Sequence, residues 1–192
     1  MELLTGILTA FGLSASAGLN AYIPLLVVAL LGRFTNLIKL TPPWDTLESW
    51  WIIGLLVVLS SIEFFADKIP AVNHINDVIQ TFIRPAAGAI VFAASAQVIT
   101  NMHPVLALTM GLLIAGGVHA VKAVGVRPMV TATTAGAGNI PVSMAEDLVS
   151  TLLSIVAVVV PIIIAVVLIL LTSWVVWLLW RRINRDRLRS ES

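Results

Sequence analysis

The chain has 192 residues, of which 59% are hydrophobic and 11% are charged, and its mean hydropathy is +1.02. A soluble domain carries about 25% charged residues because its surface faces water, so this composition excludes an ordinary soluble globule. The formal net charge of +1 argues against nucleic acid as a partner, and the lack of cysteine excludes disulfides and thiolate metal sites. We therefore expect an integral membrane protein whose main surroundings are the lipid bilayer.

The first third of the chain predicts two transmembrane spans. An apolar stretch runs from about residue 7 to residue 31, and polar and small residues around Asn20, followed by Pro24, interrupt it. A loop over about 33–48 follows. The second span is expected over 50–66, and it begins on a tryptophan pair that suits a membrane–water interface.

The stretch from Pro70 to Arg84 differs in character from the spans around it. Apolar residues recur there at helical spacing and polar residues lie between them. This pattern predicts a short amphipathic helix that lies at the interface or dips into the protein. A third span is expected over 85–100 and a fourth over 105–124.

The last third of the chain contains one irregular and one very long apolar segment. Residues 127–141 are too apolar for an aqueous loop and too rich in Gly and Thr for a lipid-facing helix. Non-helical backbone at membrane depth must be buried in protein or line a cavity, so we expect a broken or re-entrant element there. Residues 148–180 would make a helix of about 50 Å, longer than a hydrocarbon core of about 30 Å. This helix must tilt, kink at Pro161 or leave the bilayer.

These elements predict an all-α membrane protein of about five transmembrane helices, one short amphipathic helix and one or two broken or re-entrant segments. We expect one integral membrane domain over 1–180 and a basic tail over 181–192. The positive-inside rule makes that tail cytoplasmic, and we expect the bacterial plasma (inner) membrane. Five spans put the N-terminus outside and the loop with Arg33 and Lys39 inside; a sixth crossing would reverse the N-terminus.

Two short segments resemble each other, namely Asn20-Ala-Tyr-Ile-Pro24 and Asn139-Ile-Pro141. Each follows small residues and precedes an apolar run. Interrupted hydrophobic segments at matching positions of two halves point to the binding site of a transporter. A weak internal, inverted repeat and a chance similarity among common membrane-helix residues are both compatible with the pattern.

Charged residues within or beside the spans are the first candidates for a site, since each costs at least about 2.5 kcal/mol in the bilayer centre. Glu63 and Asp67 are one helical turn apart and therefore share a face. They predict an ion or proton site. The alternative for Glu63 is a structural role, either at the interface or paired with Arg84.

A second group of candidates surrounds the irregular segment. Glu146 and Asp147 either face a polar cavity or only stabilise a helix start, where Ser143 and Glu146 have the spacing of a capping box. Arg84, Arg127 and Lys122 would then be counter-ions of the acids or ligands of an anionic substrate. Asn20 and Asn139 are candidates at helix breaks, and His119 is expected to be hydrogen-bonded structure.

Enzyme signatures are missing from the sequence. It contains no P-loop, GxGxxG, HExxH or cysteine-based site. We therefore expect no enzyme activity and no cofactor, and the sequence leaves the identity of any metal open.

The residues from Glu63 to Pro70, with Asp77 and the Arg84-Pro85-Ala-Ala-Gly88 motif, resemble a family of small bacterial integral membrane proteins, domain of unknown function 4126. The segments around Asn20 and Asn139 are similar to it too, so the resemblance covers about residues 5–175. Family members often have a second acid after the Ile-Pro, where this chain has Asn73-His74. The resemblance supports a membrane protein and implies no particular activity.

We therefore expect a small transporter or channel for an ion or small polar solute, with a homo-oligomer as one option. The alternative is a lipid-handling or scaffold protein whose buried charges are structural. A membrane enzyme that acts on lipid head groups is the least favoured reading.

Overall fold

The computed structural model describes residues 2–67, 70–100, 102–134 and 136–161, together with isolated positions between 163 and 181. The described part of the chain is helical and contains no strand. Its elements are α1 (Glu2–Leu19), α2 (Tyr22–Phe34), a 3-10 turn (Trp44–Glu48), α3 (Trp50–Ala66), α4 (Pro70–Thr100), α5 (Pro104–Val121), a π turn (Lys122–Val126), α6 (Arg127–Thr134) and α7 (Asn139–Val159).

Three of these helical stretches are long and apolar enough to cross a membrane. They cover Val78–Ala96, Pro104–Thr134 and Asn139–Val159. Three shorter apolar helices accompany them, over Leu4–Leu19, Tyr22–Phe34 and Trp50–Ala66. The expected all-helical membrane protein is thus confirmed in outline.

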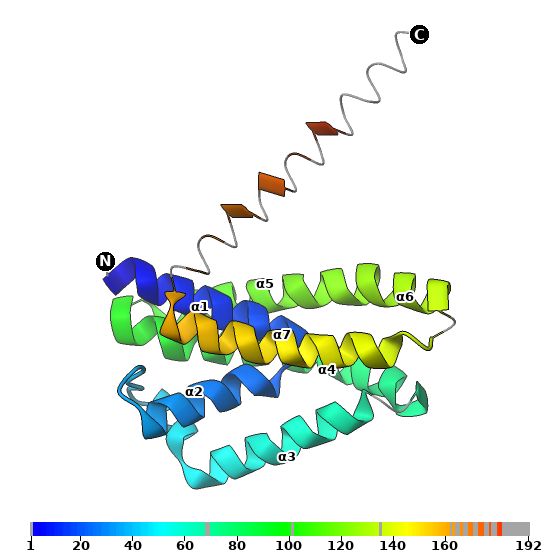
Figure 1. The fold of residues 1–192 in the computed structure, drawn as a ribbon. Coiled ribbons are helices and arrows are strands. Elements are labelled where there is room, and N and C mark those ends of the chain that lie inside the picture. The colour runs from blue at the N-terminus through cyan, green and yellow to red at the C-terminus, as the bar shows by residue number, and fades with distance from the viewer. Residues whose placement is uncertain are drawn as a thin grey trace.

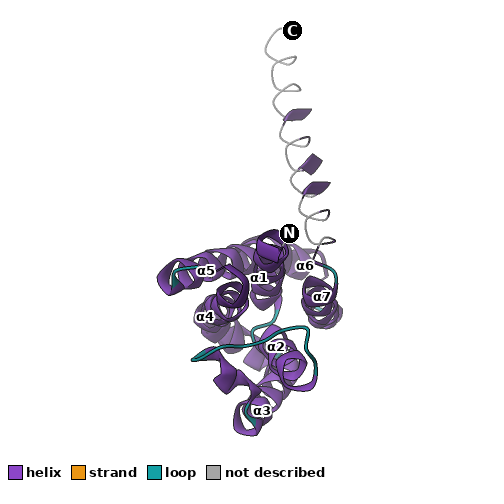
Figure 2. Ribbon diagram, turned by 90° about the vertical axis from the view of Figure 1, so that its left-hand side faces the viewer, coloured by secondary structure: helices purple, strands orange, loops and turns teal. Residues whose placement is uncertain are grey.

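Successive helices run back and forth between the two ends of the bundle (Figure 1). Seen from one end, α1 lies between α5 and α7, α4 packs against α1 and α5, and α3 lies at the periphery next to α2 (Figure 2). The turn between α1 and α2 lies inside the bundle, because Asn20 and Ala21 are almost fully buried. At 13 residues, α2 is about 20 Å long, shorter than the hydrocarbon core of about 30 Å. The chain reverses its direction between α1 and α2 inside the bundle (Figure 1).

Small residues hold the centre of the bundle together. A Cβ atom added to Gly88 would lie 2.2 Å from the Ala115 Cβ, and one added to Gly111 would lie 2.3 Å from the Gly88 carbonyl oxygen. The Ser14 hydroxyl donates to the carbonyl oxygens of Gly88 and Gly111, at 3.2 and 2.8 Å. Close backbone approach of this kind is how membrane helices associate without a hydrophobic driving force.

The α1–α7 contact is polar. Ser16 Oγ lies 2.8 Å from Ser150 Oγ and 2.7 Å from Ser154 Oγ, and the Thr9 hydroxyl donates to the Ala157 carbonyl oxygen at 2.8 Å. These hydroxyls satisfy one another or the backbone, as polar groups inside a membrane protein must.

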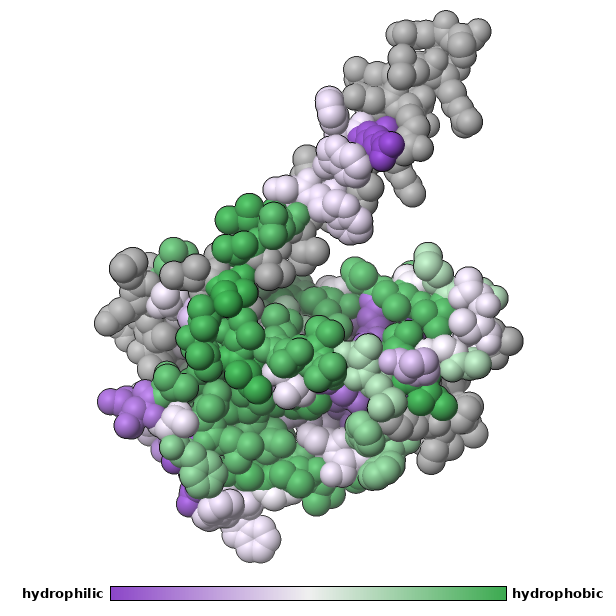
Figure 3. All heavy atoms as spheres, in the orientation of Figure 1, coloured by the Kyte–Doolittle hydropathy of each residue, from purple (hydrophilic) through white to green (hydrophobic). Residues whose placement is uncertain are grey.

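The distribution of side chains is opposite to that of a soluble protein. The buried set consists mostly of alanine, serine and a few charged residues, whereas large apolar side chains such as Trp51, Phe65 and Phe82 are exposed. Most of the face seen in Figure 3 is apolar. A surface of this kind suits lipid as the surrounding solvent.

The structure corrects the prediction of a separate amphipathic helix over 70–84. That stretch and the expected third span form one helix, α4, with Pro85 inside it. Its polar side is directed inward, since Gln80 and Arg84 are buried, and its apolar residues Val78 and Phe82 are exposed. The polar side of the amphipathic pattern over 70–84 therefore faces a polar protein interior and not water.

The predicted broken element over 127–141 is largely helical. The π turn joins α5 to α6 in one continuous helical stretch (Figure 1), and of the described residues in this segment only 136–138 leave the helix. Gly136 has a φ of 89° there, which suits a residue without a side chain. The hydroxyls of Thr133 and Thr134 donate to carbonyl oxygens of the preceding turn, including that of Val130, so these polar groups are satisfied within the helix.

Other topological predictions are affected as well. Because α1 and α2 reverse at Asn20, the N-terminal end of α1 and the loop with Arg33 and Lys39 lie at the same end of the bundle (Figure 1), not at opposite ends. The Asn20 and Asn139 segments open α2 and α7, which run in the same direction in this view, whereas an inverted repeat requires opposite directions. The predicted tail over 181–192 lies outside the described residues apart from Arg181.

We expect Gly111→Ala to lower the thermal stability of the purified protein in detergent, because the added Cβ would meet the Gly88 carbonyl oxygen of α4 at 2.3 Å. Overpacking of this kind costs about 1–3 kcal/mol. Gly54→Ala is the matched control, since nothing lies within 4 Å of its Cβ position. Equal melting temperatures for the two variants would contradict the close α4–α5 contact.

Candidate functional site: a buried charge cluster

The centre of the candidate site is a buried ion pair between α3 and α4. The Arg84 guanidinium donates to Glu63 Oε1 at 2.9 Å, and both side chains are 1% exposed. Arg84 Nη1 lies 3.4 Å from His119 Nδ1, and the other ring nitrogen of His119 lies 3.2 Å from the Thr81 hydroxyl. His119 is thus hydrogen-bonded, as expected, and Glu63 is paired with Arg84, the structural alternative considered for it.

Asp67 follows the end of α3 and is surrounded by four polar groups. The Arg127 guanidinium lies 3.4 Å and that of Arg84 4.0 Å from Asp67 Oδ2. The Ser143 hydroxyl donates to the same oxygen at 2.9 Å, and the Asn76 amide donates to Oδ1 at 2.7 Å. One carboxylate therefore links α3 to α4, α6 and α7.

Lys122 and Glu146 form the next ion pair, at 2.7 Å between Nζ and Oε2. Arg127 lies 3.8 Å from the same Glu146 oxygen, and Lys122 also donates to the Leu19 carbonyl oxygen at 3.2 Å, near the end of α1. The π turn brings the two cations together, because its i→i+5 hydrogen bond joins the Arg127 N–H to the Lys122 carbonyl oxygen. Residues five apart then lie about one turn above each other on one face.

Asn20 connects the break between α1 and α2 to α7. Its amide nitrogen donates to Asp147 Oδ1 at 2.9 Å, and its carbonyl oxygen accepts from the backbone N–H groups of Tyr22 and Ile23 at 3.1 and 3.0 Å. It thereby caps the first turn of α2, whose N–H groups would otherwise be unsatisfied inside the protein. Asn20 bonds to another helix, which was one of the two roles considered for it.

The carboxylates of this cluster outnumber its cations. Among the described side chains it contains four acids and three bases: Glu63, Asp67, Glu146 and Asp147 against Arg84, Lys122 and Arg127. Glu63 Oε2 and Arg84 Nε are also buried without a hydrogen-bond partner among the described residues. Counted over the described side chains, the cluster therefore has one carboxylate more than it has cations.

Seven of the eight residues singled out in the sequence belong to this cluster, and Asn139 does not. Asn139 exchanges hydrogen bonds with Thr131 across the turn between α6 and α7, at 3.1 and 3.4 Å. Ser143 is not a helix cap, because α7 begins four residues earlier, at Asn139. Its hydroxyl is turned to Asp67 instead, so the capping-box interpretation is wrong.

The contributions of Asn76 and Ser143 were not assigned from the sequence, whereas Lys122 pairs with Glu146 as one of the counter-ions considered there. A signal for Ser143 existed, since it shares a helical face with Glu146 and Ser150 at spacings of three and seven. No group of three or more His, Asp or Glu side chains in the described part of the chain is arranged to hold a metal ion.

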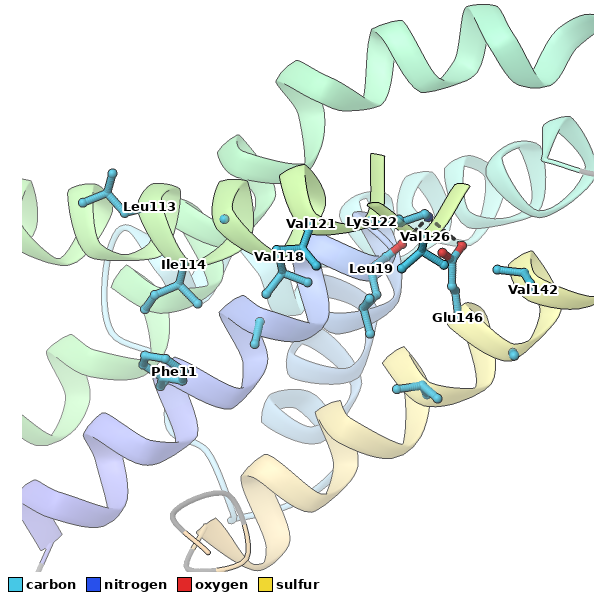
Figure 4. A pocket seen from close by; sticks show the side chains of 14 residues that line it. Phe11, Leu19, Leu113, Ile114, Val118, Val121, Lys122, Val126, Val142 and Glu146 are labelled. Carbon is cyan, nitrogen blue, oxygen red and sulfur yellow. Dashed lines mark hydrogen bonds and ion pairs between the residues drawn. The ribbon is translucent and has the colours of Figure 1, made fainter. Parts of the chain in front are cut away.

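Two hollows reach the acids of α7 from different sides. A groove of about 740 Å³ between α1, α5 and α7 is apolar along its length and ends at Lys122 and Glu146 (Figure 4). A smaller cavity of about 220 Å³ lies against α2 and α3 and is lined by Asn20, Ser60, Ser61 and Asp147, among others. The neighbouring acids of α7 therefore line different spaces.

The fold and this cluster define a small helical protein with membrane-span helices and a charged interior. A family model described as domain of unknown function (DUF4126) matches residues 7–181, so the chain belongs to the DUF4126 family, as its motifs suggest. Comparison with curated proteins and with solved structures finds no match.

Arg84→Met should destabilise the protein strongly, since it leaves the buried Glu63 carboxylate without its cation. Removing one partner of a buried pair costs about 3–5 kcal/mol, whereas removing both is far milder. We therefore expect the melting temperature in detergent to fall most for Arg84→Met and less for the double variant Glu63→Gln/Arg84→Met. Lys39→Met removes an exposed cation and should leave it unchanged. A single variant as stable as the wild type would show that the pair is not coupled to the fold.

Proposed function

We propose that this protein is a small membrane transporter or channel for a cation or proton, with the charge cluster as its polar centre. The observation that supports this best is that carboxylates outnumber cations by one among the described side chains of the buried cluster. A net charge inside a membrane protein is costly. A proton or a monovalent cation is the smallest species that would remove that cost.

The position of the cluster fits this proposal. It lies where the short pair α1–α2 turns back inside the bundle, so a helix break and the charged side chains share one site. Helix breaks at membrane depth are where transporters expose backbone groups to substrates and ions. Glu63 Oε2, which accepts no hydrogen bond from the described residues, is an acceptor available to a proton.

Further parts of the proposal concern the surroundings of the protein. We place it in the bacterial plasma membrane with residues 181–192 in the cytoplasm, because that tail is rich in arginine. Oligomeric assembly stays an option that the small-residue helix faces allow.

The groove favours a second candidate function, the handling of membrane lipids. An apolar groove that is open to the bilayer and ends at charged groups also suits an acyl chain with a head group. Lipid scrambling in liposomes without solute flux would support this second candidate over the first.

Asp147→Asn should abolish or greatly reduce flux of the transported cation or proton in proteoliposomes. The substitution removes the charge, while the new amide oxygen can still accept the hydrogen bond from Asn20. Flux of protons, sodium and potassium would be followed with ion-sensitive dyes inside the vesicles, at equal reconstituted amounts of protein.

Asp45→Asn is the control, because Asp45 is an exposed acid in the 3-10 turn and does not belong to the cluster. Equal flux in wild type and Asp147→Asn would show that the charge of Asp147 is not needed for transport. A complete lack of cation and proton flux in the wild type would contradict the proposed function itself.

A further inference from the structure

The small cavity against α2 and α3 carries an inference about how the polar centre is reached. We infer that this cavity, which is lined by Asn20, Ser60, Ser61 and Asp147 among others, is filled with water and connects the Asp147 carboxylate to the aqueous phase. The inference deepens the proposed function, on which its role in transport rests, by naming the hydrated side of the route.

The first observation is the position of Asp147. It belongs to α7, one of the helices long and apolar enough to cross a membrane, and it remains partly exposed. One of its carboxylate oxygens accepts a hydrogen bond from the Asn20 amide at 2.9 Å in the wall of the cavity. Ionisable side chains in membrane-spanning helices face the protein interior or a water-filled cavity. A carboxylate that keeps exposed surface beside a hollow is therefore expected to be hydrated there.

The second observation is the hydroxyl of Ser60, which lines the same cavity. Its Oγ is buried and has no hydrogen-bond partner among the described residues. The next hydroxyl in the chain, that of Ser61, donates to the Val57 carbonyl oxygen at 2.8 Å, as serines in membrane helices commonly do. A buried hydroxyl that lacks such a bond bears the full cost of its desolvation. A water molecule bound to Ser60 removes that cost.

The size and walls of the cavity select water as its occupant. Its volume of about 220 Å³ is below the range of about 300–1,000 Å³ that is typical of sites for small organic molecules. A water molecule occupies about 30 Å³ in the liquid and needs two to four polar partners. The cavity therefore has room for several water molecules, and its hydroxyl, amide and carboxylate groups supply partners. The larger groove has no hydroxyl or amide side chain among its lining residues.

The cavity also lies close to one end of the bundle. The end of α3 and the start of α7 lie at the same end (Figure 1). Ser60 precedes the helix end at Ala66 by six residues, and Asp147 follows the helix start at Asn139 by eight. At 1.5 Å per residue both lie about 10 Å from that end. Water would thus have to enter only the outer third of a hydrocarbon core about 30 Å thick.

Cysteine substitution tests this inference directly, because the sequence contains no cysteine and one introduced thiol reports only its own surroundings. N-ethylmaleimide reacts with the thiolate, which forms where water solvates the charge. Ser60→Cys and Ser61→Cys place the thiol in the cavity. Ile62→Cys is the matched control at the same depth, since Ile62 is exposed on α3 and does not line the cavity. Gly117→Cys places a thiol in the larger groove, where an added Cβ meets nothing within 4 Å.

The initial rate of labelling would be measured by intact mass spectrometry on the full chain in lipid vesicles. We expect at least one of the two cavity thiols to react at least tenfold faster than those of Ile62→Cys and Gly117→Cys. Labelling after unfolding in detergent shows that each thiol is present, and melting temperatures show that each variant is folded. If Ser60→Cys does not fold, Ser61→Cys alone decides. Cavity thiols that react no faster than either control would overturn the inference.

The functional part is tested by flux in proteoliposomes. Treatment with the reagent should block proton or cation flux through Ser60→Cys or Ser61→Cys, whichever is labelled, and should leave flux through Ile62→Cys unchanged. Slow labelling of both cavity thiols with intact flux in the wild type would reject the cavity as the route and leave the transporter in place. Fast labelling without any flux in the wild type would keep the water-filled cavity and reject the transporter.

Discussion

The mutual neutralisation of charges away from water is the constraint on which the rest of this structure depends. Arg84 is fully buried and cannot lose its charge, because a guanidinium stays protonated in proteins. It therefore needs carboxylates close by, and Glu63 and Asp67 supply them from one face of α3. Asp67 in turn holds Arg127 and Ser143, so the paired charges tie α3, α4, α6 and α7 to each other.

The lipid surroundings also explain why the helices are closely packed elsewhere in the bundle. Lipid provides no hydrophobic driving force between helices, so the apolar contacts depend on close approach of small residues. Gly88 and Gly111 allow α4 and α5 to touch through their backbones, and the serines of α1 and α7 bond across their contact. Large side chains are left for the outer surface.

The membrane class, the helical fold and most of the cluster could be predicted from the sequence, because the cost of charge in lipid makes residues such as Glu63 and Arg84 informative without any geometry. The break at Asn20 was predicted from the polar and small residues around it and from Pro24. What could not be predicted was the direction in which amphipathic faces point. The sequence pattern of 70–84 is the same whether its polar side faces water or a charged protein interior. The sequence therefore predicted two elements, 70–84 and 85–100, where the structure has the single helix α4. The π turn was missed too, because the apolar pattern of 122–126 does not distinguish i→i+4 from i→i+5 hydrogen bonding.

The π turn has a consequence for how this interior could rearrange. It amounts to one residue more than a regular helical turn requires, and each residue of an α-helix turns the chain by about 100°. If the extra residue moved along the helix, α6 would rotate about its own axis while α5 and α7 stayed in place. Arg127 would swing away from Asp67 and Glu146, and Lys122 would remain with Glu146. The cluster could thus be opened by the rotation of one short helix, without the large movements of whole domains that rocking transporters require.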